Sequence, residues 1–216
     1  MRNRFDRQLS VLNREMIEMG ALCEDIFSKV LIALNERNKE VYEEIVSLGS
    51  EIDRKERSIE TLCLKLLLQQ QPVARDLRQI SAALKMITDM ERIGDQVEDI
   101  AEIIPFIDER SDSVNNILNK MAQASITMVK ESIDAFVAQD IDLAKKVLSD
   151  DDTVDECFDE MKLALVTELR EDREDGESFI DLIMIAKYFE RIGDHATNIA
   201  EWVIFSVTGV HKEEDL

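Results

Sequence analysis

The chain has 216 residues, of which 45% are hydrophobic and 34% charged, so it is long enough for one large or two small domains with a packed core. Its formal net charge of −21 argues against nucleic-acid binding and favours metal cations and basic protein surfaces as ligands. No apolar run resembles a signal peptide or approaches the roughly 20 residues that span a bilayer, so we predict a soluble intracellular protein without membrane insertion.

Six helices are predicted where apolar residues recur at three- and four-residue spacing: about 8–35, 40–69, 73–104, 114–136, 141–170 and 177–207. Pro72 fits the first turn of the third helix, and Pro105 ends that helix. Because few prolines and glycines interrupt long stretches of helix-forming residues, we expect almost no β-sheet.

Two segments repeat. "MERIGDQVEDIAE" begins at Met90, and "FERIGDHATNIAE" begins 99 positions later (189 − 90). The predicted second and fifth helices also correspond, with "EVYEEIVSLGSEID" at 40–53 matching "DLAKKVLSDDDTVD" at 142–155, an offset of 102 (142 − 40). We therefore predict an all-α fold of two tandem three-helix bundles related by internal duplication, the first over residues 1–107 and the second over 108–216.

The repeated segments carry an apolar stripe and an acidic stripe on nearly opposite faces of a helix. The apolar residues are predicted to be buried: Met90, Ile93, Val97, Ile100, Phe189, Ile192 and Ile199. The acids are predicted to keep solvent access: Glu91, Asp95, Glu190 and Asp194.

Cysteine and glycine positions give two further expectations. The cysteines, Cys23, Cys63 and Cys157, are odd in number and lack metal-binding spacing, so we expect buried reduced thiols. Gly94 and Gly193 interrupt helices, where glycine costs about 1 kcal/mol relative to alanine. A close helix contact explains them better than room for a metal-bound ligand.

The fifth and sixth helices are predicted to bring oxygen donors together. In an antiparallel hairpin that turns near residues 173–174, the column of Asp151, Asp155 and Asp159 faces the column of Glu190, Asp194 and Asn198. No Lys or Arg four residues away offsets Glu190 and Asp194, or Glu91 and Asp95, and like charges at this spacing repel. Two interpretations remain open: a solvated acidic face, or a site for one or more Mg, Ca, Mn or iron ions.

The first half has fewer acids at the matching positions. Asp53 can oppose Glu91, Asp95 and Asp99, but Gly49 and Arg57 stand where the second half has Asp151 and Asp159. Because Arg57 supplies a counter-ion, we expect a metal to bind this half more weakly or with fewer ions.

The two "ERIGD" segments, "QQPVARDLR" from Gln70 and "SDDDTVDE" from Ser149 resemble the PhoU family of phosphate-uptake regulators, over nearly the whole chain. The resemblance implies two three-helix bundles with metal-binding Glu/Asp-x-x-x-Asp motifs, in some members holding multinuclear iron. The matching pairs are Glu91 with Asp95, Glu190 with Asp194, and Asp151 with Asp155. Gly49 with Asp53 does not match.

The same resemblance implies a role. Such a protein is a cytoplasmic negative regulator of phosphate-starvation signalling, not an enzyme, and acts between the ATPase of a Pst-type phosphate transporter and a sensor histidine kinase. The family commonly forms homodimers. Within "PVARDLR", the family match makes Arg75, Asp76 and Arg78 candidates for partner binding.

Two alternatives belong to other functional classes. A purely structural acidic adaptor would bind a basic partner and no metal. A di-iron carboxylate enzyme would need Glu-x-x-His on facing helices, a motif that the sequence lacks. His195 points about 100° away from the preceding Asp194, and His211 lies in the C-terminal tail, so neither histidine favours the enzyme.

Overall fold

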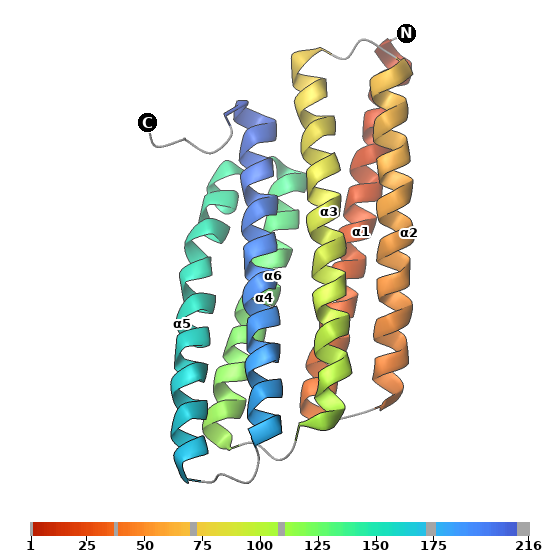
Figure 1. The fold of residues 1–216 in the computed structure, drawn as a ribbon. Coiled ribbons are helices and arrows are strands. Elements are labelled where there is room, and N and C mark those ends of the chain that lie inside the picture. Colours follow the sequence, from red (N-terminus) through yellow and green to blue (C-terminus); the bar gives the residue numbers. More distant parts are fainter. Residues whose placement is uncertain (1, 37–38, 70–72, 108–110, 172–175, 211–216) are drawn as a thin grey trace.

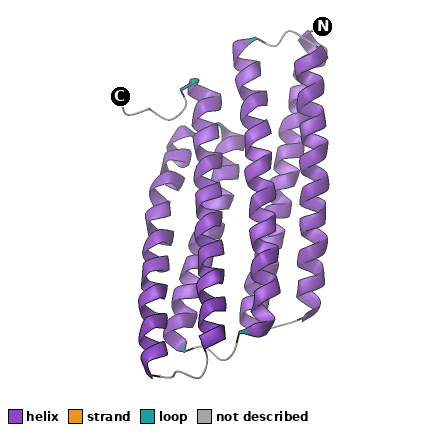
Figure 2. Cartoon of the chain, viewed as in Figure 1, coloured by secondary structure: helices purple, strands orange, loops and turns teal. Residues whose placement is uncertain are grey.

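A computed structural model describes the chain except for residues 1, 37–38, 70–72, 108–110, 172–175 and 211–216. The described residues form six α-helices and one short 3₁₀ turn: α1 (Arg2–Glu36), α2 (Lys39–Gln69), α3 (Ala74–Ile103), η1 (Ile104–Phe106), α4 (Asp112–Ala138), α5 (Ile141–Glu171) and α6 (Gly176–Thr208). No strand occurs among them, as Figure 2 shows. The prediction of an all-α chain is confirmed.

The predicted helix boundaries need small corrections. α1 begins at Arg2 rather than near residue 8, because Phe5 lies in the core and extends the apolar face by a turn. Pro105 lies inside the 3₁₀ turn η1 that follows α3. Pro72 lies outside the described residues.

Local hydrogen bonds fix both ends of α4. Ser111 is the N-cap of α4, and its hydroxyl accepts a hydrogen bond from the Val114 amide at 3.2 Å. Gln139 ends α4 in a left-handed conformation, with φ of 52°. The Asp140 carboxylate then accepts from the amides of Asp142 and Leu143 at 2.9 and 3.0 Å, which starts α5.

The six helices form two three-helix bundles side by side (Figure 1). α1, α2 and α3 pack together, as do α4, α5 and α6, while α3 against α6 and α1 against α4 join the bundles. α2 and α5 lie at the outer edges. α3 and α6 run antiparallel, because Asp89 contacts His195 whereas Asp99, later in α3, is bonded to Tyr188, earlier in α6.

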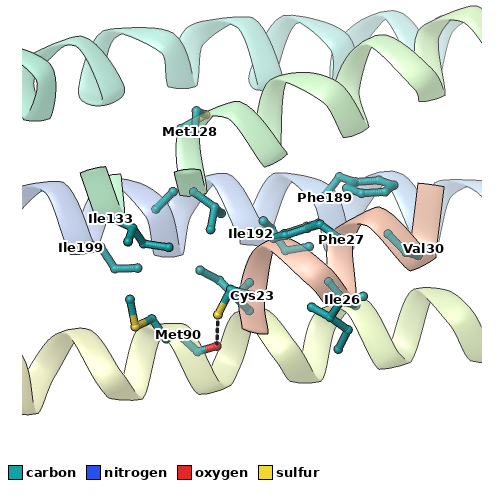
Figure 3. Packing of buried hydrophobic residues seen from close by; sticks show 14 of the residues in the cluster. Cys23, Ile26, Phe27, Val30, Met90, Met128, Ile133, Phe189, Ile192 and Ile199 are labelled. Carbon is teal, nitrogen blue, oxygen red and sulfur yellow. Dashed lines mark hydrogen bonds between the residues drawn. The ribbon is translucent and has the colours of Figure 1, made fainter. Parts of the chain in front are cut away.

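One hydrophobic cluster runs through both bundles, and Figure 3 shows part of it. Equivalent contacts recur in the two halves: the Cys23 thiol donates to the Met90 carbonyl at 3.8 Å, and the Ser125 hydroxyl donates to the Phe189 carbonyl at 3.1 Å. These pairs correspond under the offsets of 102 (125 − 23) and 99 (189 − 90). The internal duplication is therefore visible in individual core hydrogen bonds.

Burial agrees with the predicted stripes. The seven apolar residues predicted to be buried, from Met90 to Ile199, have no exposed surface, and the four acids keep solvent access. All three cysteines are free and buried, as predicted. Within the described part of the chain, no helix is both long and apolar enough to cross a membrane.

Candidate metal centre

Three carboxylates meet between α2 and α3. Asp53 of α2 and Glu91 and Asp95 of α3 each offer an oxygen within 4.8 Å of the others, and all three side chains are half-buried. The repeat of acid, three residues, acid places Glu91 and Asp95 on the face of α3 that meets α2. A group of three oxygen donors this close is suited to a cation.

The electrostatics of this group show crowding with partial compensation. Burial, followed by the charge of Asp95, raises the pKa of the Glu91 carboxyl. Arg92 lies 3.1 Å from Asp95 and 3.5 Å from Glu91, and Arg57 lies 3.7 Å from Asp53. The expectation that the α3 acids lack a counter-ion is therefore wrong, because a side chain one or three positions away can also reach them.

A fourth carboxylate, from Glu98 of α3, lies against the backbone of α2. A Cβ atom at Gly49 would overlap this carboxylate, standing only 2.5 Å from Glu98 Cδ, so only glycine leaves room for it. Burial first, and then Asp95 and Asp53, raise the pKa of Glu98 to about 7. We call Asp53, Glu91, Asp95 and Glu98 the first-half cluster.

The matching acids between α5 and α6 are Asp151, Asp155, Glu190 and Asp194, which we call the second-half cluster. Burial and then Asp155 raise the pKa of Asp151 to about 6, and burial and then Glu190 raise the pKa of Asp194. Among the described residues, these acids do not form a group of three ligand atoms within 4.8 Å. The sequence predicts more ligands in this half, whereas the group of three closely spaced carboxylates found among the described residues lies in the first half.

The second half has a lysine beside its acids, where the first half has Arg57 and Arg92. The Lys187 ammonium pairs with Glu190 and lies 5.5 Å from the centre of the Phe158 ring on α5. The second half thus has an internal cation beside its acids, which corrects the expectation that Glu190 lacks a counter-ion. The first half has Thr88 and Glu56 at the corresponding positions (187 − 99 and 158 − 102).

Three predicted ligands lie away from the clusters. The side chain of Asp159 is 73% exposed and pairs with Lys162 at 2.5 Å. The Asn198 amide donates to Asp89 of α3 at 3.2 Å. Asp99 faces α6, where the Tyr188 hydroxyl bonds to it. Asn198 and Asp99 therefore belong to the contact between the bundles.

The two helix-interior glycines make close contacts. A Cβ at Gly94 would meet Ile52 Cδ1 at 3.3 Å, which is a packing contact. A Cβ at Gly193 would meet Asp151 Oδ1 at 3.0 Å and Val154 at 3.6 Å. The packing explanation therefore accounts for Gly94, whereas Gly193 also leaves space for the Asp151 carboxylate.

The chemistry of these residues fits a hard cation. Both clusters offer carboxylate oxygens alone, the donor type of Mg²⁺, Ca²⁺, Mn²⁺ and iron sites, and the Glu98 carboxylate lies in the space that a side chain at Gly49 would fill. Asp53, Glu91 and Asp95 would hold a cation in the first half, and Asp151, Asp155, Glu190 and Asp194 in the second.

Comparison with known proteins identifies the fold family. The sequence profile of the PhoU domain matches residues 16–104 and again residues 118–203. The chain belongs to the PhoU family. The two matches fall one in each bundle, so each bundle is one PhoU repeat.

Curated PhoU relatives match over nearly the full length. A "phosphate-specific transport system accessory protein PhoU homolog" of Clostridium acetobutylicum is 34% identical, covering 98% of this chain and 97% of its own. A homologue of the same description from Zymomonas mobilis is 36% identical, covering 97% of this chain and 89% of its own.

Solved PhoU structures share the architecture. PhoU from Pseudomonas aeruginosa superposes with a TM-score of 0.91 at 32% identity, covering 95% of this chain and all of its own. The phosphate transport system regulatory protein PhoU from Streptococcus pneumoniae gives a TM-score of 0.87 at 25% identity, covering 95% of this chain and 98% of its own.

Of the "PVARDLR" segment, singled out by its PhoU resemblance, residues 74–78 form the start of α3. Exposed Arg75 lies 3.3 Å from the Gln139 side chain and helps to line a pocket of about 450 Å³ between α1, α3 and the end of α4. Arg78 is half-buried against Gly209, and Asp76 is half-buried. Of these three candidates, only Arg75 lines the pocket.

Proposed function

We propose that this protein is a cytoplasmic negative regulator of phosphate uptake that links a Pst-type transporter, through its ATPase, to a sensor histidine kinase. The proposal is supported chiefly by PhoU matches that cover most of both repeats, together with relatives named as accessory proteins of the phosphate-specific transport system. We also propose that it acts as a homodimer and without catalysis of its own.

Metal binding is the second part of the proposal. Burial first, and then the charges of neighbouring acids, raise the pKa values of Glu98 and Asp151, so the acids of each cluster are partly desolvated and repel one another. A bound divalent or iron cation would offset that repulsion and tie together the two helices that carry the acids. The clusters would then fix the bundle faces that partners meet.

The pocket beside Arg75 is the proposed partner surface. Its lining combines exposed apolar side chains, Ile17 and Val137, with the polar groups of Asn13, Arg75 and Gln139. Exposed apolar side chains next to polar groups are typical of a protein interface. Arg75→Ala should therefore weaken binding to the transporter ATPase without unfolding the helix.

Gene deletion tests the regulatory role. In phosphate-rich medium, cells without the protein should express phosphate-starvation genes, and the wild-type gene should restore repression. Asp155→Asn with Asp194→Asn should lower metal content, thermal stability and repression together. If the deletion strain still represses these genes fully, the proposed role is wrong.

The metal-free adaptor remains the second candidate, because Arg57, Arg92 and Lys187 already neutralise part of both clusters. Elemental analysis of protein purified without chelator separates the two candidates. Bound metal that falls in Asp53→Asn with Asp95→Asn supports the regulator with metal sites. Metal-free protein that still represses supports the adaptor.

A further inference from the structure

Glu98 and Gly49 form a pair that the repeat motifs do not include. Gly49 is buried in α2, and the Glu98 carboxylate occupies the space that any Cβ there would fill, with 2.5 Å to Cδ and 3.2 Å to Cγ. A carboxylate on a surface helix can usually turn into solvent. Here it lies over the facing helix, within the charge field of Asp95 and Asp53.

The duplication gives this pair a counterpart. Gly49 corresponds to Asp151 (151 − 49 is 102), and Glu98 corresponds to Thr197 (197 − 98 is 99). In the second half, Asp151 Oδ1 reaches toward α6 and lies 3.0 Å from the Cβ position of Gly193. Each half therefore has one carboxylate at this level, carried by α3 in the first half and by α5 in the second.

The difference in side-chain length allows the carboxylate to come from α3 in one half and from α5 in the other. Glutamate has one more methylene than aspartate, and a facing glycine brings the two helix backbones within its reach. In the first half the long side chain meets Gly49, and in the second half the short side chain meets Gly193. Both arrangements put an oxygen donor between the two helices of the hairpin.

We propose that Glu98 is a metal ligand of the first half, supplying from α3 the carboxylate that Asp151 supplies from α5 in the second half. This inference rests on the proposed metal binding. It restores a four-carboxylate donor set to the half whose Gly49 breaks the Glu/Asp-x-x-x-Asp motif. The two sites then have the same number of carboxylates, and they differ in which helix carries the fourth.

The charges around Glu98 are consistent with this role. Those that act most strongly on it are all acidic: Asp95, Asp53, Glu102 and Asp99. Asp151 has acidic neighbours of the same kind, led by Asp155 and Asp194. A cation between α2 and α3 would be attracted to Glu98, and a cation between α5 and α6 would be attracted to Asp151 for the same reason.

Calorimetric titration with Mn²⁺ tests the proposal. The background is the full chain with Asp155→Asn and Asp194→Asn, so that the remaining sites belong to the first half. In this background Glu98→Gln should weaken Mn²⁺ binding by about tenfold or more, since even indirect partners of a metal cost that much. The control Glu43→Gln removes an equal charge from an exposed position of α2 and should leave the affinity unchanged.

Two further variants separate ligation from general charge loss. Gly49→Ala removes no charge but displaces the Glu98 carboxylate, so it should weaken Mn²⁺ binding although alanine favours the helix. The double variant Gly49→Asp with Glu98→Thr gives the first half the same two residue types that the second half has as Asp151 and Thr197. It should recover the Mn²⁺ binding that Glu98→Thr alone loses.

The outcomes distinguish the two proposals. If the background protein binds Mn²⁺ and Glu98→Gln binds it as tightly as Glu43→Gln, Glu98 is not a ligand, while metal binding itself stands. If neither the background protein nor the wild type binds Mn²⁺, both proposals fail. Circular dichroism of each variant, expected to match the parent, excludes loss of the helices as the cause.

Discussion

The α2–α3 and α5–α6 hairpins are related by the duplication, but the residues beside their acids differ. The first-half cluster contains a tight group of three carboxylates, with Glu56 and Thr88 beside it. The second-half cluster has Phe158 and Lys187 at those two positions, and the lysine pairs with Glu190. The first hairpin also has protein cations, Arg57 and Arg92, but their side chains are 75% and 56% exposed against 44% for Lys187, so solvent screens their charge more. The first hairpin therefore depends more on a cation from solution.

This difference teaches that counting acids does not rank such sites. The second half matches more of the Glu/Asp-x-x-x-Asp motifs, yet a lysine competes there for the same oxygens. A protein cation and a metal ion neutralise the same charge, so the presence of one weakens binding of the other. Because three first-half carboxylates lie within 4.8 Å of one another and the arginines beside them are more exposed than Lys187, we expect the first half to bind a divalent cation more tightly.

The largest expected effect tests whether the two halves form one folding unit. Met90 and Phe189 are equivalent and have no exposed surface, and both belong to one cluster. Phe189→Ala should cost about 3 to 5 kcal/mol of unfolding free energy, and Met90→Ala about 2 to 5. Urea denaturation followed by circular dichroism should give a single transition in both variants. Separate transitions for the two halves would contradict one shared core.

The next comparison concerns metal affinity. In the otherwise wild-type protein, Asp95→Asn should weaken the tightest Mn²⁺ binding by about 10- to 100-fold, a range known for residues that support metal sites. Asp194→Asn should leave that tightest binding nearly unchanged, because it alters the hairpin that already contains Lys187. Titration calorimetry measures both. The reverse order would restore the ranking expected from the sequence.

A smaller effect should follow from removing the lysine. Lys187→Met keeps an apolar stem beside Phe158 but frees Glu190, so Mn²⁺ binding by the second half should strengthen several-fold. The measurement uses protein with Asp53→Asn and Asp95→Asn, which removes two of the four first-half acids and leaves the second-half cluster complete. Lys162→Met, which frees the exposed Asp159, is the matched control and should change nothing. Equal affinities in the two lysine variants would show that Lys187 does not compete.

The smallest effect is a difference in pH dependence without metal. The pKa of Glu98 rises from 4.5 to about 7 on folding, so the folded state keeps this proton to higher pH than the unfolded state. Stability should therefore fall as pH rises from about 4.5 to about 7, and Glu98→Gln should remove that part of the slope. The pKa of Asp151 rises from 3.8 to about 6, so Asp151→Asn should act in a window about one unit lower.

Urea denaturation at several pH values between about 4 and 8, with chelator present, measures these slopes. Glu43→Gln again serves as the charge-matched control, because its side chain is exposed. Identical windows for the Glu98 and Asp151 variants would mean that the two hairpins do not differ in this respect.

Much of the fold could be predicted because helical periodicity is a local property of the sequence. The buried stripe from Met90 to Ile100 and its repeat follow directly from spacing. Periodicity gives the direction of a side chain but not which neighbouring helix covers it. Asp99 and Asn198 therefore lie in a different contact from the predicted one, since the packing of α3 on α6 is not encoded in either helix alone.

The site could be predicted only in part. Counting residues from the turn places Asp151 level with about Thr197, but on the first hairpin, where α2 ends at Gln69 and α3 begins at Ala74, it places Gly49 level with about Gly94. The contact of Glu98 with Gly49 therefore depends on the reach of the glutamate side chain, which residue counting does not give. The roles of Arg92 and Lys187 are harder to predict, because a long flexible side chain can reach several partners, and the folded structure decides among them.

The antiparallel packing of α3 on α6 has a consequence for how the molecule is put together. Two repeats that meet in opposite directions are related by an approximate twofold axis, the symmetry that two identical chains adopt when they pair. A single polypeptide that carries both repeats turns their association into an intramolecular step, with an effective concentration fixed by the connection between α3 and α4. The pairing of the repeats is thereby independent of how much protein the cell contains. Each copy of a position is also free to change alone, as cysteine at 23 and serine at 125 have done.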